Sequence, residues 1–514
     1  MNVNWSALIV FTVIFVFVTV LGFVAAHWRR GDMNLLHEWG LGGSRFGTFM
    51  TWFLMGGDFF TASAMVALPA LVFGAGAMGA FGITYSAFIF PVLFVFAPRL
   101  WSVARKHGYV TAADFVRGRY GNRWLASAVA LTGLVATMPY IALQLVGMQV
   151  VIAALGLETK GLVGDLPLIL AFVILAGFTY TSGLRAPAAI AVVKDILLYI
   201  TGIAAVVGIP MALGGYPAIF NHVPIEKLTL PSPGPGTLGN YSIYVTLGIG
   251  SALSWGLYPH SITGLLSANH RRAIQRNAFL LPIYTLVIGL IMLMGYMAIS
   301  AQVAQKAEFE GLFKQFGSTF AVPALYLNFF PSWFAGLAFA GIAIGALVPA
   351  AIMSIAAANL FSRNVYREFC RPDCTAQQET NVAKWVSLLV KFGALIIVFV
   401  LPSQYMVNLQ LIGSIAIIQT LPSVFLSLYT RWFNPWALLV GWACGLVTGI
   451  SMLVALGFKS PYYPLDIGGF AVPGYAAIYA FAINLVVAVV LTVIIKAASE
   501  ARSQDETVAS DYVV

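Results

Sequence analysis

Long runs of apolar residues, separated by short polar segments, dominate the sequence. Thirteen of these runs reach the roughly 20 residues that a helix needs to cross the hydrocarbon core of a bilayer. They cover residues 5–27, 47–75, 79–101, 124–155, 166–184, 187–213, 241–266, 278–301, 335–361, 383–402, 405–428, 433–457 and 473–497. The pattern therefore predicts an all-α integral membrane protein with about 13 transmembrane helices.

The composition supports a membrane protein and excludes several other classes. Of the 514 residues, 60% are hydrophobic and 9% are charged, and the mean hydropathy is +0.90. A soluble domain carries about 25% charged residues, so a water-soluble enzyme and a nucleic-acid-binding protein are excluded. Three cysteines, Cys370, Cys374 and Cys444, are too few for a disulfide framework or a four-ligand zinc site. The lipid bilayer is the expected partner, and no nucleic acid and no cofactor are expected.

The basic residues predict the orientation of the chain. An odd number of spans places the two termini on opposite sides of the membrane, and Lys and Arg collect in cytoplasmic loops. With the N-terminus outside, the inner loops hold 19 Lys and Arg residues and the outer loops hold five. We therefore expect an external N-terminus and a cytoplasmic C-terminus. The first run is followed by Trp28-Arg29-Arg30 without a small-residue cleavage site, which indicates a retained helix.

A segment that cannot be helical divides the chain near its middle. The outer loop at 214–240 contains the Pro- and Gly-rich run 231–236. Such a division is typical of transporters built from two repeats of opposite orientation, although no residue-level repeat is visible. We expect one membrane domain over 1–514, comprising an extra helix and inner loop (1–46), a first repeat (47–213), a second repeat (241–428), two C-terminal helices (429–500) and a disordered acidic tail (501–514).

Two of the 18 acidic residues, Asp58 and Asp195, lie inside predicted spans. An ionisable group at this depth costs at least about 2.5–3.5 kcal/mol, so it points to an ion or substrate path. The alternative is a hydrogen-bonded acid that only ties helices together. For Asp195, which follows Lys194 and lies nearer the inner surface, a structural ion pair is the alternative interpretation.

The residues around Asp58 weaken the helix in the middle of its span. Gly56 and Gly57 precede it, and Thr61 and Ser63 follow it. Unwinding here would free backbone carbonyls, which are hard oxygen ligands for a small cation. Irregular backbone at this depth is tolerated where it lines a cavity. Close helix packing through small residues is the alternative.

A second interruption lies in the run 241–266, where Gly256 is followed by Tyr258-Pro259-His260. His260 is the one histidine deep in a predicted span, which argues against a haem held by two histidines. Its side chain is either packed and hydrogen-bonded, or in contact with a substrate or proton. The hydroxyl of Ser354 bonds its own helix backbone unless this helix face meets the break at Asp58.

Several short segments together resemble one known family. They are Gly56-Gly57-Asp58, 139–147, 180–186, Lys194-Asp195, Tyr258-Pro259-His260 and Met353-Ser354. On these segments the chain resembles the sodium:solute symporters over residues 39–458. The resemblance implies a LeuT-like fold, an inverted five-helix repeat with broken core helices, preceded by one extra helix and followed by two.

Within this family the sequence is most similar to the bacterial monocarboxylate transport permeases, on the segments 39–43, 108–112, 136–139 and 345–351. This branch implies a secondary active symporter of the bacterial inner membrane that takes up short monocarboxylates (lactate, pyruvate, propionate) with Na+ or H+. A solute sensor that retains the transporter fold, or a family symporter for another small organic solute, is the alternative. An enzyme is not expected, because a catalytic cluster could enlist only Asp58, Asp195 and His260.

The resemblance also implies a cation site. It assigns backbone oxygen ligands to Gly56, Phe59 and Ala351, and a hydroxyl ligand to Ser354. The next position usually carries a second hydroxyl, but here it is Ile355, whose side chain supplies no oxygen. Proton coupling through Asp58 or Asp195 is therefore the alternative to sodium coupling.

Substrate contacts are expected around the two interruptions. The positive ends of half-helices there could hold a carboxylate without a buried arginine. The candidate contacts are Thr61, Tyr140, Gln144, Trp255, Tyr258 and His260. Each of these side chains could instead belong to the packed core.

Overall fold

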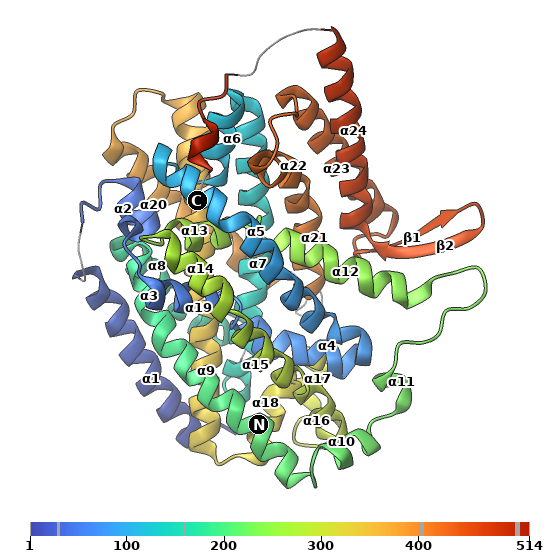
Figure 1. Ribbon diagram of the computed structural model, residues 1–514. Helices are drawn as coiled ribbons and strands as arrows, with labels where there is room; N and C mark the ends of the chain where they lie inside the picture. The colour runs from blue at the N-terminus through green and yellow to red at the C-terminus, as the bar shows by residue number, and fades with distance from the viewer. Residues whose placement is uncertain (1, 28–30, 159–160, 401–405, 499–503, 513–514) are drawn as a thin grey trace.

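The computed structural model describes residues 2–27, 31–158, 161–400, 406–498 and 504–512. Long helices form one bundle, with the N-terminus at its lower end and the C-terminal segment beside α6 in its upper half (Figure 1). The first half of the chain contains α1 (Trp5–Val24), α2 (Leu36–Leu41), α3 (Thr48–Gly56), α4 (Leu68–Ala75), α5 (Phe81–His107), α6 (Ala112–Tyr120), α7 (Arg123–Ala154), α8 (Gly161–Ser182), α9 (Arg185–Ala212), α10 (Tyr216–His222), α11 (Ile225–Leu228) and α12 (Gly239–Trp255).

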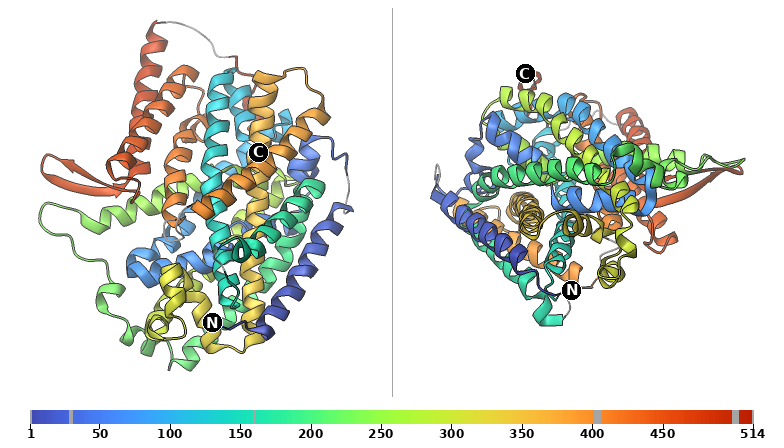
Figure 2. Two further views of the ribbon diagram at one scale, coloured as in Figure 1. Left: turned by 180° about the vertical axis from the view of Figure 1, so that it is seen from behind. Right: turned by 90° about the horizontal axis from the view of Figure 1, so that it is seen from below.

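The second half contains α13 (Pro259–Leu266), α14 (Arg271–Leu280), α15 (Pro282–Met292), α16 (Met294–Ser300), α17 (Glu310–Phe316), α18 (Ala321–Phe329), α19 (Ser332–Phe361), α20 (Ala376–Val400), α21 (Met406–Ile417), α22 (Leu421–Val424), α23 (Pro435–Ala455), β1 (Tyr462–Ile467), β2 (Phe470–Tyr475) and α24 (Ala476–Ala498). Figure 2 shows the same bundle from behind and from below, with the strands projecting from its side.

The helical membrane architecture predicted from the sequence is confirmed. Within the described residues, eleven helices are long and apolar enough to cross a membrane, and together they cover eleven of the thirteen predicted spans. The longest of them, Ser63–His107, begins inside the predicted span 47–75 and covers the predicted span 79–101. The other two predicted spans, 47–75 and 241–266, are the ones expected to be interrupted. The chain leaves the α-helix after Gly56 in the first, and between α12 and α13 in the second.

α19 is the most deeply buried of the long helices, since its most apolar stretch is completely buried. It packs against α1, α7, α9 and α20. Small residues make this packing close. A Cβ atom added to Gly345 would lie 3.3 Å from the backbone nitrogen of Ala62, in the segment that follows the break in the first interrupted span. The small residues of α19 therefore let the irregular backbone of that break reach the centre of the bundle.

The break after α3 is packed against an aromatic side chain. A π-helical segment, Ser63–Ala67, resumes the helix before α4. Gly56 lies directly against the ring of Tyr284 on α15, where an added Cβ would come within 2.0 Å of a ring carbon. Gly56 is therefore required here because a side chain has no space.

A β-hairpin between α23 and α24 was not predicted. β1 and β2 are antiparallel, and Ile467 pairs with Phe470 across a turn formed by Gly468 and Gly469. Both glycines have positive φ, at 63° and 88°, as a two-residue hairpin turn requires. The Gly-Gly pair flanked by apolar residues was the sequence signal that could have identified it.

Residues 504–512 of the tail, which was predicted to be disordered, contact the helical bundle, and the remaining tail residues lie outside the described part of the chain. Asp511 forms an ion pair with Lys106 at the end of α5, with a separation of 2.5 Å. Asp505 pairs with Arg119 of α6 at 2.6 Å. The acidic side chains of the tail thus pair with basic side chains near the ends of α5 and α6.

We expect Gly56→Ala to destabilise the protein by about 1–3 kcal/mol, because the added methyl group must displace Tyr284 from a close-packed site. Thermal unfolding of the purified protein in detergent measures this as a melting temperature lower by several degrees. Gly74→Ala in α4 is the matched control, since the added Cβ would lie 3.8 Å from Ser318, its nearest neighbour outside its own helix. Equal melting temperatures for the two variants would contradict the packing argument.

Candidate functional site

The two helix breaks meet inside the bundle. Nε2 of His260, in the first turn of α13, lies 3.2 Å from Oδ2 of Asp58, which follows α3. The hydroxyl of Ser261 donates to the same carboxylate oxygen over 3.4 Å. Asp58 is 4% exposed and His260 is 1% exposed, so the contact is shielded from solvent. Two side chains that the sequence placed in separate interruptions are thus direct neighbours.

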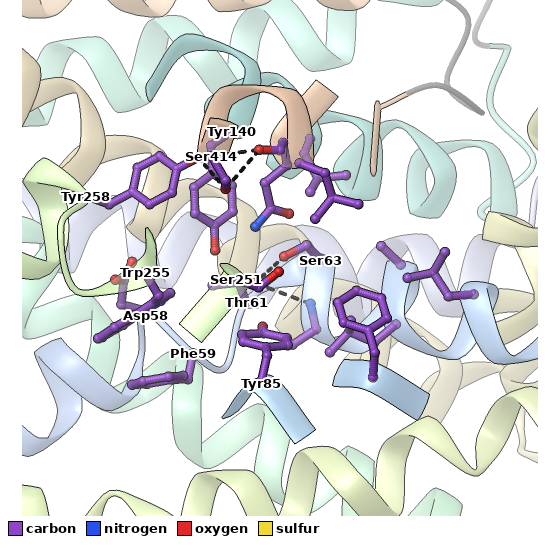
Figure 3. A pocket seen from close by; sticks show the side chains of 18 residues that line it. Asp58, Phe59, Thr61, Ser63, Tyr85, Tyr140, Ser251, Trp255, Tyr258 and Ser414 are labelled. Carbon is purple, nitrogen blue, oxygen red and sulfur yellow. Dashed lines mark hydrogen bonds between the residues drawn. The ribbon is translucent and has the colours of Figure 1, made fainter. Parts of the chain in front are cut away.

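A pocket lies beside this contact. Figure 3 shows Tyr140, Tyr258 and Ser414 approaching from one side, and Phe59 and Tyr85 from the other. Its polar or aromatic lining side chains are those of Asp58, Phe59, Thr61, Ser63, Tyr85, Phe81, Tyr140, Ser251, Trp255, Tyr258, Gln410 and Ser414. The pocket therefore draws on both interrupted spans and on α5, α7 and α21.

Four of the six candidate substrate contacts line this pocket: Thr61, Tyr140, Trp255 and Tyr258. The other two lie behind its wall. Gln144 accepts a hydrogen bond from the backbone amide of Ser63 over 3.3 Å and so supports the break. The ring of His260 lies 5.3 Å, centre to centre, from the rings of both Tyr140 and Tyr258.

The pocket combines an apolar wall with several hydroxyl groups. Phe59 and Trp255 stack with ring centres 4.1 Å apart. The hydroxyls of Thr61 and Ser63 are 2.7 Å apart and hydrogen-bonded to each other. Among the described residues that line the pocket, Asp58 is the one charged side chain and none is Lys or Arg. This chemistry suits a small solute with an apolar part and a few hydrogen-bond acceptors.

The candidate cation ligands lie on two elements, α19 and the break after α3. The hydroxyl of Ser354 donates to the carbonyl oxygen of Ala351 over 2.8 Å, as a membrane serine commonly does. The carbonyl oxygen of Gly56 accepts from the backbone amides of Phe59 and Phe60 at 2.9 and 3.0 Å. Ile355 is fully buried beside Ser354.

Sequence reasoning treated Lys194 only as a neighbour of Asp195, but the structure gives it a larger part. Its ammonium donates to the carbonyl oxygens of Gly57 and Phe60 over 2.6 and 2.7 Å. It also lies 2.8 Å from Oδ1 of Asp195. The other oxygen of Asp195 accepts a hydrogen bond of 2.6 Å from the hydroxyl of Tyr284. The expected ion pair is present, and it is attached to the first helix break.

A second buried lysine was missed. Lys391 on α20 is fully buried, and its ammonium donates over 2.7 Å to the hydroxyl of Ser387. Ser387 in turn donates to Ser354 over 3.3 Å, which connects the lysine to a candidate cation ligand. Its place in the middle of the predicted span 383–402 was the available signal, because a charge at that depth is costly.

Known proteins of similar structure show the fold. A Na+-coupled sialic acid symporter, solved in a substrate-bound outward-open state, superposes with a TM-score of 0.74 at 13% identity, over 97% of this chain and 99% of its own. This likeness identifies the architecture as LeuT-like, in agreement with the broken helices described above.

Relatives of similar sequence extend over nearly the whole chain. A protein of Rhizobium johnstonii named monocarboxylate transport permease protein is 47% identical over 98% of this chain and 99% of its own. The uncharacterized symporter YodF of Bacillus subtilis is 30% identical over 87% of both chains. Residues 39–445 match the model of the sodium:solute symporter family. The protein, with its two broken helices meeting at a buried pocket, therefore belongs to the sodium:solute symporter family.

Proposed function

We propose that the protein is a secondary active symporter that takes up short monocarboxylates, of the lactate, pyruvate and propionate type, together with Na+ or H+. The observation that carries this proposal is the 47% identity, over almost the entire length of both chains, to a protein named as a monocarboxylate transport permease. The small pocket with an apolar wall and hydroxyl groups supports it.

The pocket chemistry supports a particular placement of the acid. Thr61, Tyr140 and Tyr258 offer hydroxyl donors to a carboxylate, and the stacked rings of Phe59 and Trp255 offer a surface to a short alkyl chain. Hydrogen bonds to an ionised acceptor are stronger than neutral ones. In this placement the hydroxyl groups orient the acid and the rings limit its length.

Coupling to a cation follows from the charge of the substrate. A monocarboxylate that enters a cell works against the negative-inside potential, at a cost of about 2.3 kcal/mol per charge for each 100 mV. The charged side chain that lines the pocket among the described residues is the acid Asp58, which adds repulsion. A cation that enters with the substrate removes both penalties.

The same proposal includes the topology. We place the protein in the bacterial inner membrane with the N-terminus outside and the C-terminus in the cytoplasm, because Lys and Arg concentrate in the loops of one side. The two inverted repeats correspond to residues 47–213 and 241–428, so that each contributes one of the two broken spans.

Uptake of radiolabelled lactate into proteoliposomes tests the function, with inward Na+ and H+ gradients imposed separately. We expect accumulation driven by one of the two gradients. We expect Asp58→Asn to abolish it while the protein still inserts, because an amide can hold neither a charge nor an extra proton at neutral pH. Asp466→Asn, on the exposed hairpin, is the matched control. Uptake that follows neither gradient would favour the sensor or another solute, and unchanged accumulation by Asp58→Asn would remove that residue from coupling.

Ile355→Ser is expected to increase the dependence of uptake on sodium several-fold, because it places a second hard oxygen beside Ser354. Uptake measured against sodium concentration detects the change. Ile352→Ser introduces the same hydroxyl at another buried position of α19 and should leave the sodium dependence unchanged. An identical response of both variants would place the cation site elsewhere.

A further inference from the structure

Lys194 binds the first helix break in the manner of a small cation. An ammonium group has three protons to donate. Three acceptors surround this one: the carbonyl oxygens of Gly57 and Phe60, at 2.6 and 2.7 Å, and Oδ1 of Asp195, at 2.8 Å. The side chain is fully buried. The positive charge at the break is thus supplied by the chain itself.

Lys194 takes two of the carbonyls at the break, and these are the direct chain neighbours of Gly56 and Phe59, whose carbonyls are the candidate cation ligands. Carbonyl groups freed in an interrupted membrane helix are the usual ligands of a coupling ion. Gly57 and Phe60 lie on either side of Asp58 and Phe59, so the ammonium spans the unwound turn. A second cation that bound these two carbonyls would have to displace the ammonium, which Asp195 holds in place.

The Lys194–Asp195 pair also provides a route for a proton. We propose that Lys194 is the coupling group of the symporter and that it carries a proton in place of a bound sodium ion. This inference rests on the proposed function. In the step, an N–H bond of Lys194 breaks and an O–H bond forms at Oδ1 of Asp195, 2.8 Å away, which leaves a neutral amine and a neutral carboxylic acid. The acid then loses the proton to the cytoplasm.

This step loosens the break without removing its hydrogen bonds. The neutral amine retains two N–H groups for the carbonyls of Gly57 and Phe60, and its lone pair can accept from the acid. Hydrogen bonds that involve an ionised group are about twice as strong as neutral ones. Proton loss therefore weakens the attachment of α9 to the break, which is the change that an opening transporter needs.

Few other ionisable groups surround Lys194. The groups that face it are Asp195 and Tyr199 on α9, Asp58 at the break and Tyr284 on α15. α1 and α19, which pack on α9, contain no titratable residue in their sequences. The other packed elements bring His27, Asp165, Tyr180, Tyr296 and Tyr326, of which Tyr326 is bonded to the carbonyl of Thr201 and Tyr296 to that of Lys227.

Lys194→Arg tests the proposal, because a guanidinium keeps its charge at every accessible pH. In proteoliposomes without sodium, we expect the unaltered protein to accumulate lactate up to about tenfold for a gradient of one pH unit, if one proton accompanies each substrate. Lys194→Arg should lose this accumulation and the pH dependence of uptake, yet still exchange labelled for unlabelled lactate. Asp195→Asn removes the proton acceptor and should give the same two results. It is the second variant, which decides the test if the larger arginine prevents Lys194→Arg from folding. Lys314→Arg, on an exposed side chain of α17, is the matched control.

Thermal unfolding in detergent provides a readout that does not use the substrate. A ligand that binds the folded state raises the melting temperature. We expect equal melting temperatures in sodium and in choline chloride, because Lys194 already occupies the break. A rise in sodium, or proton-driven accumulation by both Lys194→Arg and Asp195→Asn, would overturn the proposal. If the unaltered protein does not exchange lactate, monocarboxylate transport is contradicted but the role of Lys194 is not. The melting temperatures in sodium and in choline chloride still decide that role.

Discussion

Backbone amides and carbonyls inside a membrane must find partners within the protein, because hydrocarbon offers none. Wherever a membrane helix is interrupted, this constraint determines what surrounds the interruption. At the first break the carbonyls of Gly57 and Phe60 bind the ammonium of Lys194, and the amide of Ser63 binds Gln144. Each of these side chains comes from a different long helix, α9 or α7. The break therefore organises the helices around it, and the pocket lies where its backbone turns away from the helix axis.

The lysine that binds the carbonyls of the break brings a buried positive charge with it. A buried ammonium needs a counter-charge, and that acid needs support in turn. Asp195 supplies the charge at 2.8 Å, and Tyr284 donates to its other oxygen at 2.6 Å. Tyr284 also fills the space that the missing side chain of Gly56 leaves. One glycine, one lysine, one acid and one tyrosine thus depend on each other across three helices.

The sequence was most informative where structure is local. Length and hydropathy predicted the spans, and Gly56-Gly57 and Tyr258-Pro259 predicted both interruptions, because helix weakness is encoded by neighbouring residues. Contacts between distant residues were less accessible. Lys194 lies 137 positions from Gly57, and neither residue alone indicates the bond between them. The contacts of the acidic tail were inaccessible for the same reason, since Lys106, the basic partner of Asp511, lies far away in the chain.

The charges of the site change together in the proposed cycle. With its proton in place, the Lys194–Asp195 pair has no net charge, and its ammonium end points toward the break that carries Asp58. After the proton leaves to the cytoplasm, a neutral amine and a carboxylate remain, so the same pair carries one negative charge. An anionic substrate in the adjoining pocket is then repelled across a medium of low dielectric constant, where such repulsion is strong. Proton departure and release of the acid on the inner side would therefore favour each other, which is the linkage that symport requires.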